Sequence, residues 1–319
     1  RYYLQWDTVS GSSRANVGVS EGTSGIGQST SGSFWFTAVT TTTFVFFDVF
    51  APSGTTVIDN VSIKLADADR SVNNNGLIVN GTVTRTPVAS GADLVAYSGF
   101  NSSNYLSQPY NADLDFGTGD FCVMGWVNPT TLSGSTDWIF DLDGEIEVAV
   151  NSSSTFFNCG ATDALAASVL TIGAWTHIVA LRSSGVIYVY LNGVLNASTP
   201  NTNDVSHTGP LWIGNRIADT SRGFAGSLAL LRISATAPTA EQIAKIYNDE
   251  KVLFQENAQA TLYGASDAVT ALAHDPDTDL LHVGTSAGRS IFEGLRRVGN
   301  TTTSVSTAIS ASGGLVVEK

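Results

Sequence analysis

The sequence predicts an all-β protein, and three observations support this class. Short runs rich in aromatic and β-branched residues recur along the chain, separated by clusters of Gly, Ser, Thr and Asn. Tight-turn pairs such as Asn192-Gly193 join several of these runs, because both residue types tolerate a positive φ. A clear helix start occurs near Thr239. We therefore expect β-sandwiches with one short helix.

Residues 1–67 form the first predicted unit. Its runs YYLQWDTV, SFWFTAV and TTFVFFDVF alternate with Gly/Ser clusters, as strands and turns do. Its end, GTTVIDNVSIK, resembles the last strand of jelly-roll carbohydrate-binding modules, where I-D-N-V recurs. That resemblance implies a structural calcium ion held in part by Asp59, and no cofactor is otherwise required. The alternative is a turn Asp that bonds its own backbone.

Residues 68–91 are expected to be a linker and first strands, and 92–250 the central domain. In the latter, WTHIVALR and VIYVYLNG flank Ser183-Ser184-Gly185, which is a hairpin signal. Further strands are expected at Leu211–Ile213 and Ser227–Ile233.

The predicted helix follows these strands. Thr239-Ala-Glu-Gln makes a capping box, in which the Thr and Gln side chains satisfy free backbone N–H groups. Apolar positions near helical spacing predict that the helix continues through Asp249–Gln259.

The order of the central elements resembles a concanavalin A-like jelly roll of the laminin G type. The motifs are a Trp-led strand, a strand ending in Tyr-Leu-Asn-Gly, an Ile-Gly strand, and GFAGSLALLRI before the helix. Upstream, LDFGTGDFCVMGWV and WIFDL resemble two further strands of that family. More narrowly, residues 69–125 resemble lectin-like virion proteins of tailed bacteriophages or prophages. These resemblances imply two jelly-roll β-sandwiches in a virion structural protein.

Residues 251–319 are predicted to hold the helix end and a small β-sheet tail. Strands are expected at Ala268–Ala273, Leu280–Gly284 and Arg289–Val298, and their pattern resembles one blade of a β-propeller. Because a single three-stranded sheet leaves an apolar face and two edges open, it must pack against something else. Packing on the jelly roll is one solution, but we favour neighbouring copies, which makes this tail a candidate oligomerisation element.

The composition argues against several function classes. The net charge is −13 and only 13% of residues are charged, so a phosphate-binding surface is not expected and nucleic acid is a poor partner. No apolar run approaches the roughly 18 residues that a membrane helix requires. The abundance of Ser, Thr, Asn and Gly suits a virion or other extracellular location.

Two cysteines, Cys122 and Cys159, are too few for a metal cluster. Cys122 lies within a predicted strand, where a free thiol acts as a small apolar residue. We favour unpaired, buried thiols, and a disulfide between them remains the alternative for an extracellular protein.

The sharpest catalytic candidate is the segment Asp141-Leu-Asp-Gly-Glu-Ile-Glu147. It resembles the E-x-D-x-x-E strand of jelly-roll glucanases, in which two carboxylates serve as nucleophile and general acid. Asp143-Gly144, however, is a strong hairpin signal that would end the strand. Alternation also places Trp138, Phe140 and Leu142 inward and Asp141 outward. We therefore expect a solvated hairpin tip rather than a catalytic site.

A calcium or sugar contact is the remaining interpretation of this loop, because clustered carboxylates suit hard cations. The candidate ligand-binding residues are Asp137, Asp141, Asp143, Glu145 and Trp212. For Trp212, as for Trp35, burial is the favoured alternative to exposure.

The histidines are weaker candidates for catalysis or metal binding than this acidic segment. His177 shares a strand face with Trp175 and is expected to be a core residue. His274 and His282 could face each other across a hairpin, but two His side chains alone make a weak metal site.

Three hypotheses for function follow. The first is a non-enzymatic phage structural and adhesion protein, such as a tail fibre, tip or capsid fibre, whose lectin-like domains bind host-surface glycans. As partners it implies copies of itself, with a trimer favoured, and other virion proteins. The second is a polysaccharide-degrading glycosidase that uses the carboxylates of residues 141–147. The third is a purely structural fibre or decoration protein that binds no sugar.

Overall fold

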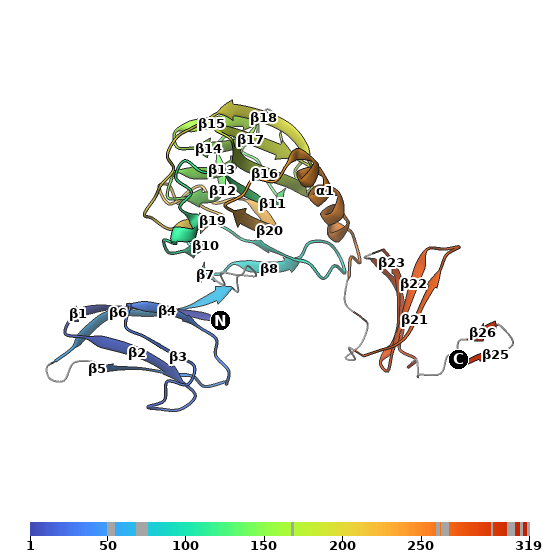
Figure 1. Ribbon diagram of the computed structural model, residues 1–319, viewed down its shortest axis with the longest axis horizontal. Coiled ribbons are helices and arrows are strands. Elements are labelled where there is room, and N and C mark those ends of the chain that lie inside the picture. Colours follow the sequence, from blue (N-terminus) through green and yellow to red (C-terminus); the bar gives the residue numbers. More distant parts are fainter. Residues whose placement is uncertain are drawn as a thin grey trace.

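The computed structural model describes residues 1–49, 55–67, 76–166, 169–259, 262, 268–294, 296–304, 310–312 and 315–317. Along the chain these residues form an N-terminal unit, a central sandwich and a C-terminal sheet (Figure 1). The fold is all-β, as the turn and strand patterns predicted, with α1 as the α-helix of the described part. Residues 68–75 of the expected linker lie outside the described residues.

The N-terminal unit packs two small layers of sheet against each other. Its strands are β1 (Tyr2–Ser10), β2 (Ser13–Gly18), β3 (Gly27–Ser29), β4 (Ser33–Phe36), β5 (Phe44–Val49) and β6 (Val57–Asp67). Strands β3, β2 and β5 form one layer, and β6, β1 and β4 form part of the other. Alternation along β1 turns Leu4 and Trp6 inward, where they pack with Ala15, Val17 and Phe36.

The central unit is a two-layered antiparallel sandwich. One layer has the order β15-β14-β13-β12-β19-β10-β7, and the other β18-β17-β16-β11-β20-β9-β8. The strands are β7 (Leu77–Asn80), β8 (Thr84–Pro87), β9 (Val95–Ser98), β10 (Tyr105–Gln108), β11 (Phe121–Pro129), β12 (Asp137–Leu142), β13 (Ile146–Val150), β14 (Thr155–Cys159), β15 (Thr162–Ala166), β16 (Thr176–Ser183), β17 (Val186–Leu191), β18 (Val194–Pro200), β19 (Leu211–Ile213) and β20 (Gly226–Ser234). A short 3₁₀ helix, η1 (Ala112–Leu114), follows β10.

The N-terminal unit and the sandwich share one continuous sheet. Strand β6 pairs with β7 through Ala66 opposite Ile78 and Asp67 opposite Leu77. Strand β7 in turn pairs with β10, so the ladder runs without interruption through ten strands from β15 to β4. A backbone ladder of this kind fixes which face of the sheet in the N-terminal unit is continuous with which face of the sheet in the sandwich.

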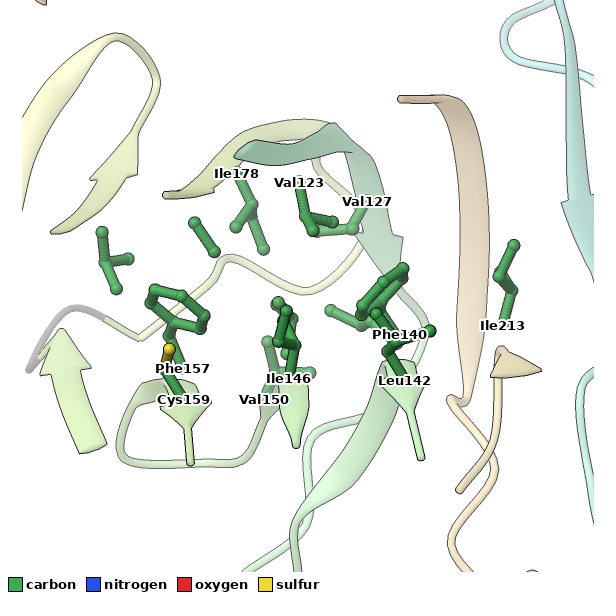
Figure 2. Packing of buried hydrophobic residues seen from close by; sticks show 14 of the residues in the cluster. Val123, Val127, Phe140, Leu142, Ile146, Val150, Phe157, Cys159, Ile178 and Ile213 are labelled. Atoms are coloured by element: carbon green, nitrogen blue, oxygen red, sulfur yellow. The ribbon is translucent and has the colours of Figure 1, made fainter. Parts of the chain in front are cut away.

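The core of the sandwich lies between its two layers. Phe140, Ile146 and Phe157, from β12, β13 and β14, have no exposed surface. Figure 2 shows them facing Val123 and Ile178 from the opposite layer. Burial of such large apolar side chains contributes about 1.5–3 kcal/mol each, which makes this layer contact the main source of stability.

The predicted turns are confirmed. Ser184 and Gly185 have φ values of 50° and 75° between the paired residues Ser183 and Val186. Asn192 and Gly193 make the same kind of turn between β17 and β18, with φ values of 51° and 80°. Both positive φ values suit the primed turns that join twisted strands.

The capping box is also confirmed, but the helix is shorter than predicted. Thr239 and Gln242 exchange both expected hydrogen bonds at the start of α1 (Ala240–Glu250). After α1 comes only a 3₁₀ turn, η2 (Lys251–Phe254). Asn257 then adopts a φ of 58° and donates its N–H to Ser90 O, so the chain leaves the helix to follow the 88–94 loop.

The C-terminal sheet has four strands, β21 (Val269–Asp275), β22 (Leu280–Thr285), β23 (Gly288–Glu293) and β24 (Arg296–Thr301). The predicted third strand over 289–298 was wrong, because the chain turns at Gly294, which has a φ of 59°. A separate hairpin follows, formed by β25 (Ser310–Ser312) and β26 (Leu315–Val317).

Both cysteines are buried and free, as favoured from the sequence. Cys159 lies in the core between the sandwich layers, whereas Cys122 packs on the other side of its sheet with Ile243 of α1. The two thiols therefore belong to different apolar clusters. Burial raises the pKa of Cys122 to about 12 and that of Cys159 to about 11, so both are held as thiols.

His177 is a core residue, as predicted. Its ring has no exposed surface and lies between Trp126, at 5.2 Å, and Tyr247 of α1, at 6.4 Å between ring centroids. Neither ring nitrogen has a hydrogen-bond partner among the described residues. Burial, followed by the charge of Arg232, lowers the pKa of His177 to about 4.

We predict that His177→Phe flattens the dependence of stability on pH between about 6.5, the unperturbed pKa of histidine, and pH 4. In the wild type the unfolded chain takes up a proton in this range while the folded chain resists it, so stability falls as pH falls. Chemical denaturation at a series of pH values measures this slope. Parallel curves for His177→Phe and wild type would contradict the prediction.

Candidate functional site

The candidate site occupies the outer face of the ten-stranded sheet, where cross-strand neighbours form a polar row. Asp141 of β12 is opposite Glu147 of β13 and opposite Trp212 of β19. Beyond Glu147 the same row continues through Asn158 to Asp163. Because directly opposite residues point to the same side of a sheet, these side chains share one face.

Trp138 points to the opposite face from the one expected, because a β-bulge precedes Phe140. The register shifts between Trp138 and Phe140, so Ile139 and Phe140 both pack in the core. An extra residue in a strand reverses the alternation before it. Trp138 therefore lies on the outer face with Asp141, and its ring meets Phe156 edge-on at 5.7 Å.

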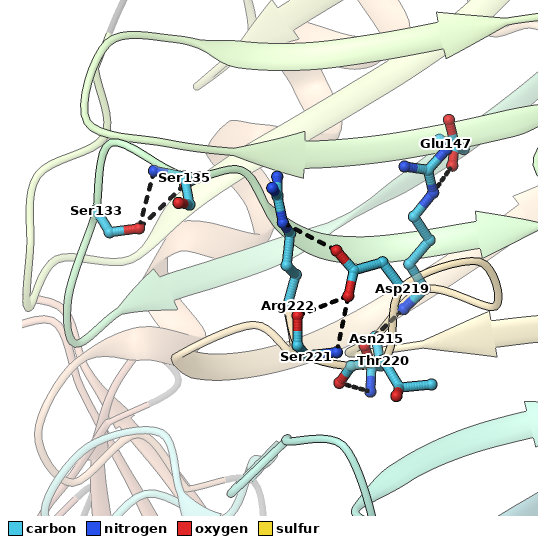
Figure 3. Close-up of polar contacts among 9 residues, drawn as sticks. Ser133, Ser135, Glu147, Asn215, Asp219, Thr220, Ser221 and Arg222 are labelled. Atoms are coloured by element: carbon cyan, nitrogen blue, oxygen red, sulfur yellow. Dashed lines mark hydrogen bonds and ion pairs between the residues drawn. The ribbon is translucent and has the colours of Figure 1, made fainter.

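Residues 214–223, here called the covering loop, fold over this face. The guanidinium of Arg216 lies 4.2 Å from the centre of the Trp138 ring, and its Nε is 2.6 Å from Glu147 Oε1. Trp138 N also donates to Arg222 O at 3.1 Å. Figure 3 shows the loop's internal contacts, in which Asp219 accepts hydrogen bonds from the N and Oγ of Ser221 and pairs with Arg222.

Asp141 anchors the covering loop and is not solvated as expected. It has no exposed surface, because the loop lies over it. Its Oδ1 accepts the N–H of Gly144 at 2.7 Å, and its Oδ2 accepts the N–H of Ile217 at 2.6 Å. Burial raises the pKa of Asp141 despite these two hydrogen bonds. Both carboxylate oxygens are thus engaged by backbone.

Glu147 is the other carboxylate of the pair. Only 3% of its surface is exposed, and burial raises its pKa to about 7 against the opposing effect of Arg216. A carboxyl group whose pKa is raised toward neutral pH has the property of a general acid. Its ion pair with Arg216, however, holds it beneath the covering loop.

The hairpin expected at Asp143-Gly144 is confirmed. Leu142 pairs with Ile146, and Asp143 and Gly144 have φ values of 53° and 78° in the turn between them. The Oδ2 of Asp143 accepts the N–H groups of Thr208 at 3.2 Å and Gly209 at 2.7 Å. Asp143 therefore fixes the neighbouring 201–210 loop to the hairpin.

An open depression of about 560 Å³ lies beside the hairpin, between the covering loop and the 201–210 loop. Its lining includes Glu145, Glu147, Asn158, Asn203 and Arg216. Asn203 is held by donating to the carbonyl of Gly160 and to Thr162 Oγ1. The depression is polar and shallow, so it offers hydrogen bonds but little enclosure.

Trp212 is partly exposed rather than buried. Its ring stacks on Tyr105 of β10, with 4.0 Å between centroids and 11° between planes. Ser107, which is opposite Trp212, accepts a hydrogen bond from Asn80 Nδ2 at 2.9 Å. Two parallel rings thus stand beside a hydroxyl and an amide, and all four side chains are partly exposed.

The remaining candidates lie apart from this cluster. Asp137 begins β12, at the opposite end of that strand from the hairpin, and burial raises its pKa. Asp59 is exposed on β6, and its Oδ1 accepts the N–H of Asn60, the contact expected of a turn Asp. A calcium ion at Asp59 stays a prediction. Among the residues that the structure describes, no three His, Cys, Asp or Glu side chains form a group suited to a metal ion.

The two tail histidines do not face each other. His282 is opposite Ala273 in the β21–β22 pair, so the adjacent His274 lies on the other face of the sheet. His274 instead contacts Asp279 at 3.0 Å.

No helix in the described part of the chain is long and apolar enough to span a membrane.

Sequence reasoning missed Arg216 and Tyr105. Arg216 follows a Gly-Asn turn with no periodic pattern, and nothing local indicates that it folds over β12. Tyr105 gave a usable signal, because alternation in YLSQ separates Tyr105 and Ser107 from the buried Leu106.

We predict that Asp141→Asn destabilises the protein by about 1–3 kcal/mol, the cost of leaving one buried backbone N–H without an acceptor. An amide side chain has a single acceptor oxygen and cannot serve both Gly144 and Ile217. Chemical denaturation gives the stability, and hydrogen exchange at the Ile217 amide reports on the loop. The exposed Asp115→Asn variant is the control, and unchanged protection of Ile217 would contradict the proposed anchor.

Comparison with known protein families gives one match, and it falls in the central unit. Residues 100–244 match the family described as the concanavalin A-like lectin/glucanases superfamily. No curated protein sequence matches the chain significantly.

Several solved structures are similar. Domain 4 of AbnA, a GH43 extracellular arabinanase from Geobacillus stearothermophilus in complex with arabinotriose, is 22% identical, with a TM-score of 0.46 over 57% of this chain and 93% of that one. The binding domain of Paraclostridial Mosquitocidal Protein 1 is 16% identical, with a TM-score of 0.49 over 74% and 66%. Trypanosoma rangeli sialidase is 13% identical, with a TM-score of 0.43 over 56% and only 30%. Residues 100–244 thus resemble the concanavalin A-like lectin/glucanases superfamily in sequence, and their layered strands form a jelly-roll sandwich.

Proposed function

We propose that the protein is a non-enzymatic adhesion protein that binds glycans through the outer face of its ten-stranded sheet. The observation that carries this proposal is the partly exposed Tyr105–Trp212 stack beside Ser107 and Asn80. A sugar ring has an apolar C–H face and a rim of hydroxyls, so it needs a flat aromatic surface next to hydroxyl and amide groups. This part of the face offers both.

The carboxylates of the same face support binding rather than hydrolysis. A retaining glycosidase needs two carboxyl groups about 5–5.5 Å apart, and an inverting one needs about 6.5–9.5 Å, in each case reaching the substrate. Asp141 has no exposed surface, and both of its oxygens accept backbone hydrogen bonds. Glu147 is paired with Arg216. Their role in this proposal is to hold the covering loop in place.

A glycosidase is the second candidate, and one observation favours it. Glu147 lines the open depression with a pKa of about 7, as a general acid would. In that case Glu147→Gln would abolish hydrolysis of oligosaccharides while leaving their binding intact. If the wild type releases no reducing sugar from any glycan that it binds, the adhesion proposal stands.

The setting that we propose is a phage particle, with the protein as a tail fibre, tip or capsid fibre. The tail supports assembly with further copies: in the described part β21 is an edge strand, and its Leu272 and Val269 side chains are 62% and 53% exposed. An exposed apolar edge favours pairing with another chain. A trimer with neighbouring virion proteins would present several weak glycan sites at once, so that avidity replaces affinity per site.

We predict that Trp212→Ala and Tyr105→Ala each remove most glycan binding, measured on a glycan array with the intact protein. Loss of one ring removes the stacking surface and leaves its partner without support. Tyr188→Ala is the matched control, because this partly exposed ring lies on the opposite layer. Circular dichroism verifies folding. Full binding by well-folded variants would contradict the site, and no binding by the wild type would favour a purely structural fibre.

We further predict that the chain forms a stable oligomer through its tail. Light scattering should give a trimeric mass for residues 1–319 and a monomeric mass after removal of 260–319, because the truncation removes the exposed β21 edge. A monomer in both cases would contradict the fibre proposal.

A further inference from the structure

We propose that the outer face between Trp212 and Trp35 is one continuous binding track for an extended chain of sugar units, and that the track crosses from the sandwich into the N-terminal unit. This inference rests on the proposed glycan binding and specifies its ligand. It adds a second aromatic pair and a polar segment between the two pairs.

The strand register places these groups in one row. Tyr105 is opposite Asn80, and Lys64 is opposite Tyr3, which is opposite Trp35. The two halves of the row meet between β7 and β6, where Lys64 Nζ donates to Asn80 Oδ1 at 3.1 Å. Because opposite residues share a face, the row presents aromatic, polar and aromatic groups in turn to the same side.

An aromatic pair marks each end of the track. The Tyr105–Trp212 stack lies at one end. At the other end, the rings of Tyr3 and Trp35 are 4.5 Å apart, and the guanidinium of Arg1 lies 5.5 Å from the Trp35 ring. Tyr3 is buried and supports Trp35, which is partly exposed. Sugar C–H groups can pack on the exposed parts of these rings.

The middle of the track supplies hydrogen bonds. Lys64 is exposed, and Asn80 and Ser107 are partly exposed. They form a short chain of hydrogen bonds, from Lys64 to Asn80 and from Asn80 to Ser107. Donors already held in position lose little entropy when they bind sugar hydroxyls.

The joint between the units is held by several contacts besides the β6–β7 pairing. Asp67 at the end of β6 accepts hydrogen bonds from Arg85 Nη2 at 2.8 Å and from Tyr97 Oη. Gly76 lies under the Trp35 ring, where an added Cβ would come within 3.2 Å of a ring carbon. These contacts keep the two aromatic pairs at a fixed separation.

The dimensions of the track select the ligand. Strands are spaced about 4.8 Å apart, so the two strand steps from β19 to β7, where the Trp35 ring lies over Gly76, span roughly 10 Å, and the whole backbone row to β4 spans roughly 24 Å; one sugar ring covers neither. Successive strands also rotate by about 20°, so the two aromatic pairs face different directions. The fitting ligand is therefore a soluble, flexible glycan chain of several units rather than a flat crystalline surface.

The test is the affinity of the full chain for graded ladders of cello-, chito-, arabino- and isomalto-oligosaccharides from two to eight units, measured by calorimetry. We expect at least one ladder whose affinity rises severalfold, up to about tenfold, with length, since a second aromatic contact of this kind is worth up to about one decade. Trp35→Ala and Lys64→Ala should reduce the affinity for long members to that of short ones. The Trp35→Phe variant should retain the dependence of affinity on oligosaccharide length.

The controls separate this inference from the proposed function. Lys245→Ala removes a 75% exposed lysine side chain from α1 and should leave every affinity unchanged. Thermal unfolding identifies any variant that disrupts the joint, and Lys64→Ala tests the track without touching Trp35. Binding that does not depend on chain length, or that Trp35→Ala and Lys64→Ala leave unchanged, overturns the track while glycan binding stands. Failure of every ladder to bind overturns both.

Discussion

The backbone ladder that continues from β10 through β7 into β6 and β1 is the constraint on which the rest of the structure depends. Two pairs of residues, Ala66 with Ile78 and Asp67 with Leu77, carry it across the joint between the units. Because the ladder fixes register, it decides which side chains of the N-terminal unit share a face with those of the sandwich. A one-residue slip there would move Lys64 and Tyr3 to the other side.

The two faces of this sheet have separate roles. The inner face of the sandwich is apolar and provides the stability of the domain (Figure 2). The outer face is divided again: toward β12 and β13 the covering loop occupies it, and toward β10 and β7 the side chains of Tyr105, Ser107 and Asn80 are partly exposed. Acidic residues that resemble a catalytic strand in the sequence serve as loop anchors here. Asp141 and Glu147 thus show how position and neighbours, rather than residue type, decide what a carboxylate does.

The sequence predicted features that depend on local chemistry. The all-β class, the Ser184-Gly185 and Asn192-Gly193 turns and the capping box at Thr239 all follow from a few adjacent residues, and the structure confirms them. The family resemblance of the central unit also held. The predictions for the site residues were less accurate. Trp138 was placed on the wrong face because a bulge has no clear signal in the sequence.

The burial of Asp141 could not be predicted, because the loop that covers it lies far along the chain. Ile217, whose N–H bonds Asp141, comes 76 residues later in the sequence. The continuous sheet has the same origin: pairing between β6 and β7 depends on the packing of two units, not on either strand's own pattern. Arg216 illustrates the general reason. Its role comes from a long-range contact with Glu147 and Trp138, and single-sequence patterns carry little information on such contacts.

The outer face of the ten-stranded sheet is the proposed site of glycan binding. The most direct test is to map backbone amide chemical shifts of the isotope-labelled protein during titration with the best-binding oligosaccharide. We expect the largest changes in β19, β10, β7 and β6, including Trp212, Tyr105, Asn80 and Lys64. Changes confined to the depression at Gly160, Asn203 and Glu145 would contradict this expectation and would place the ligand at the loop edge instead.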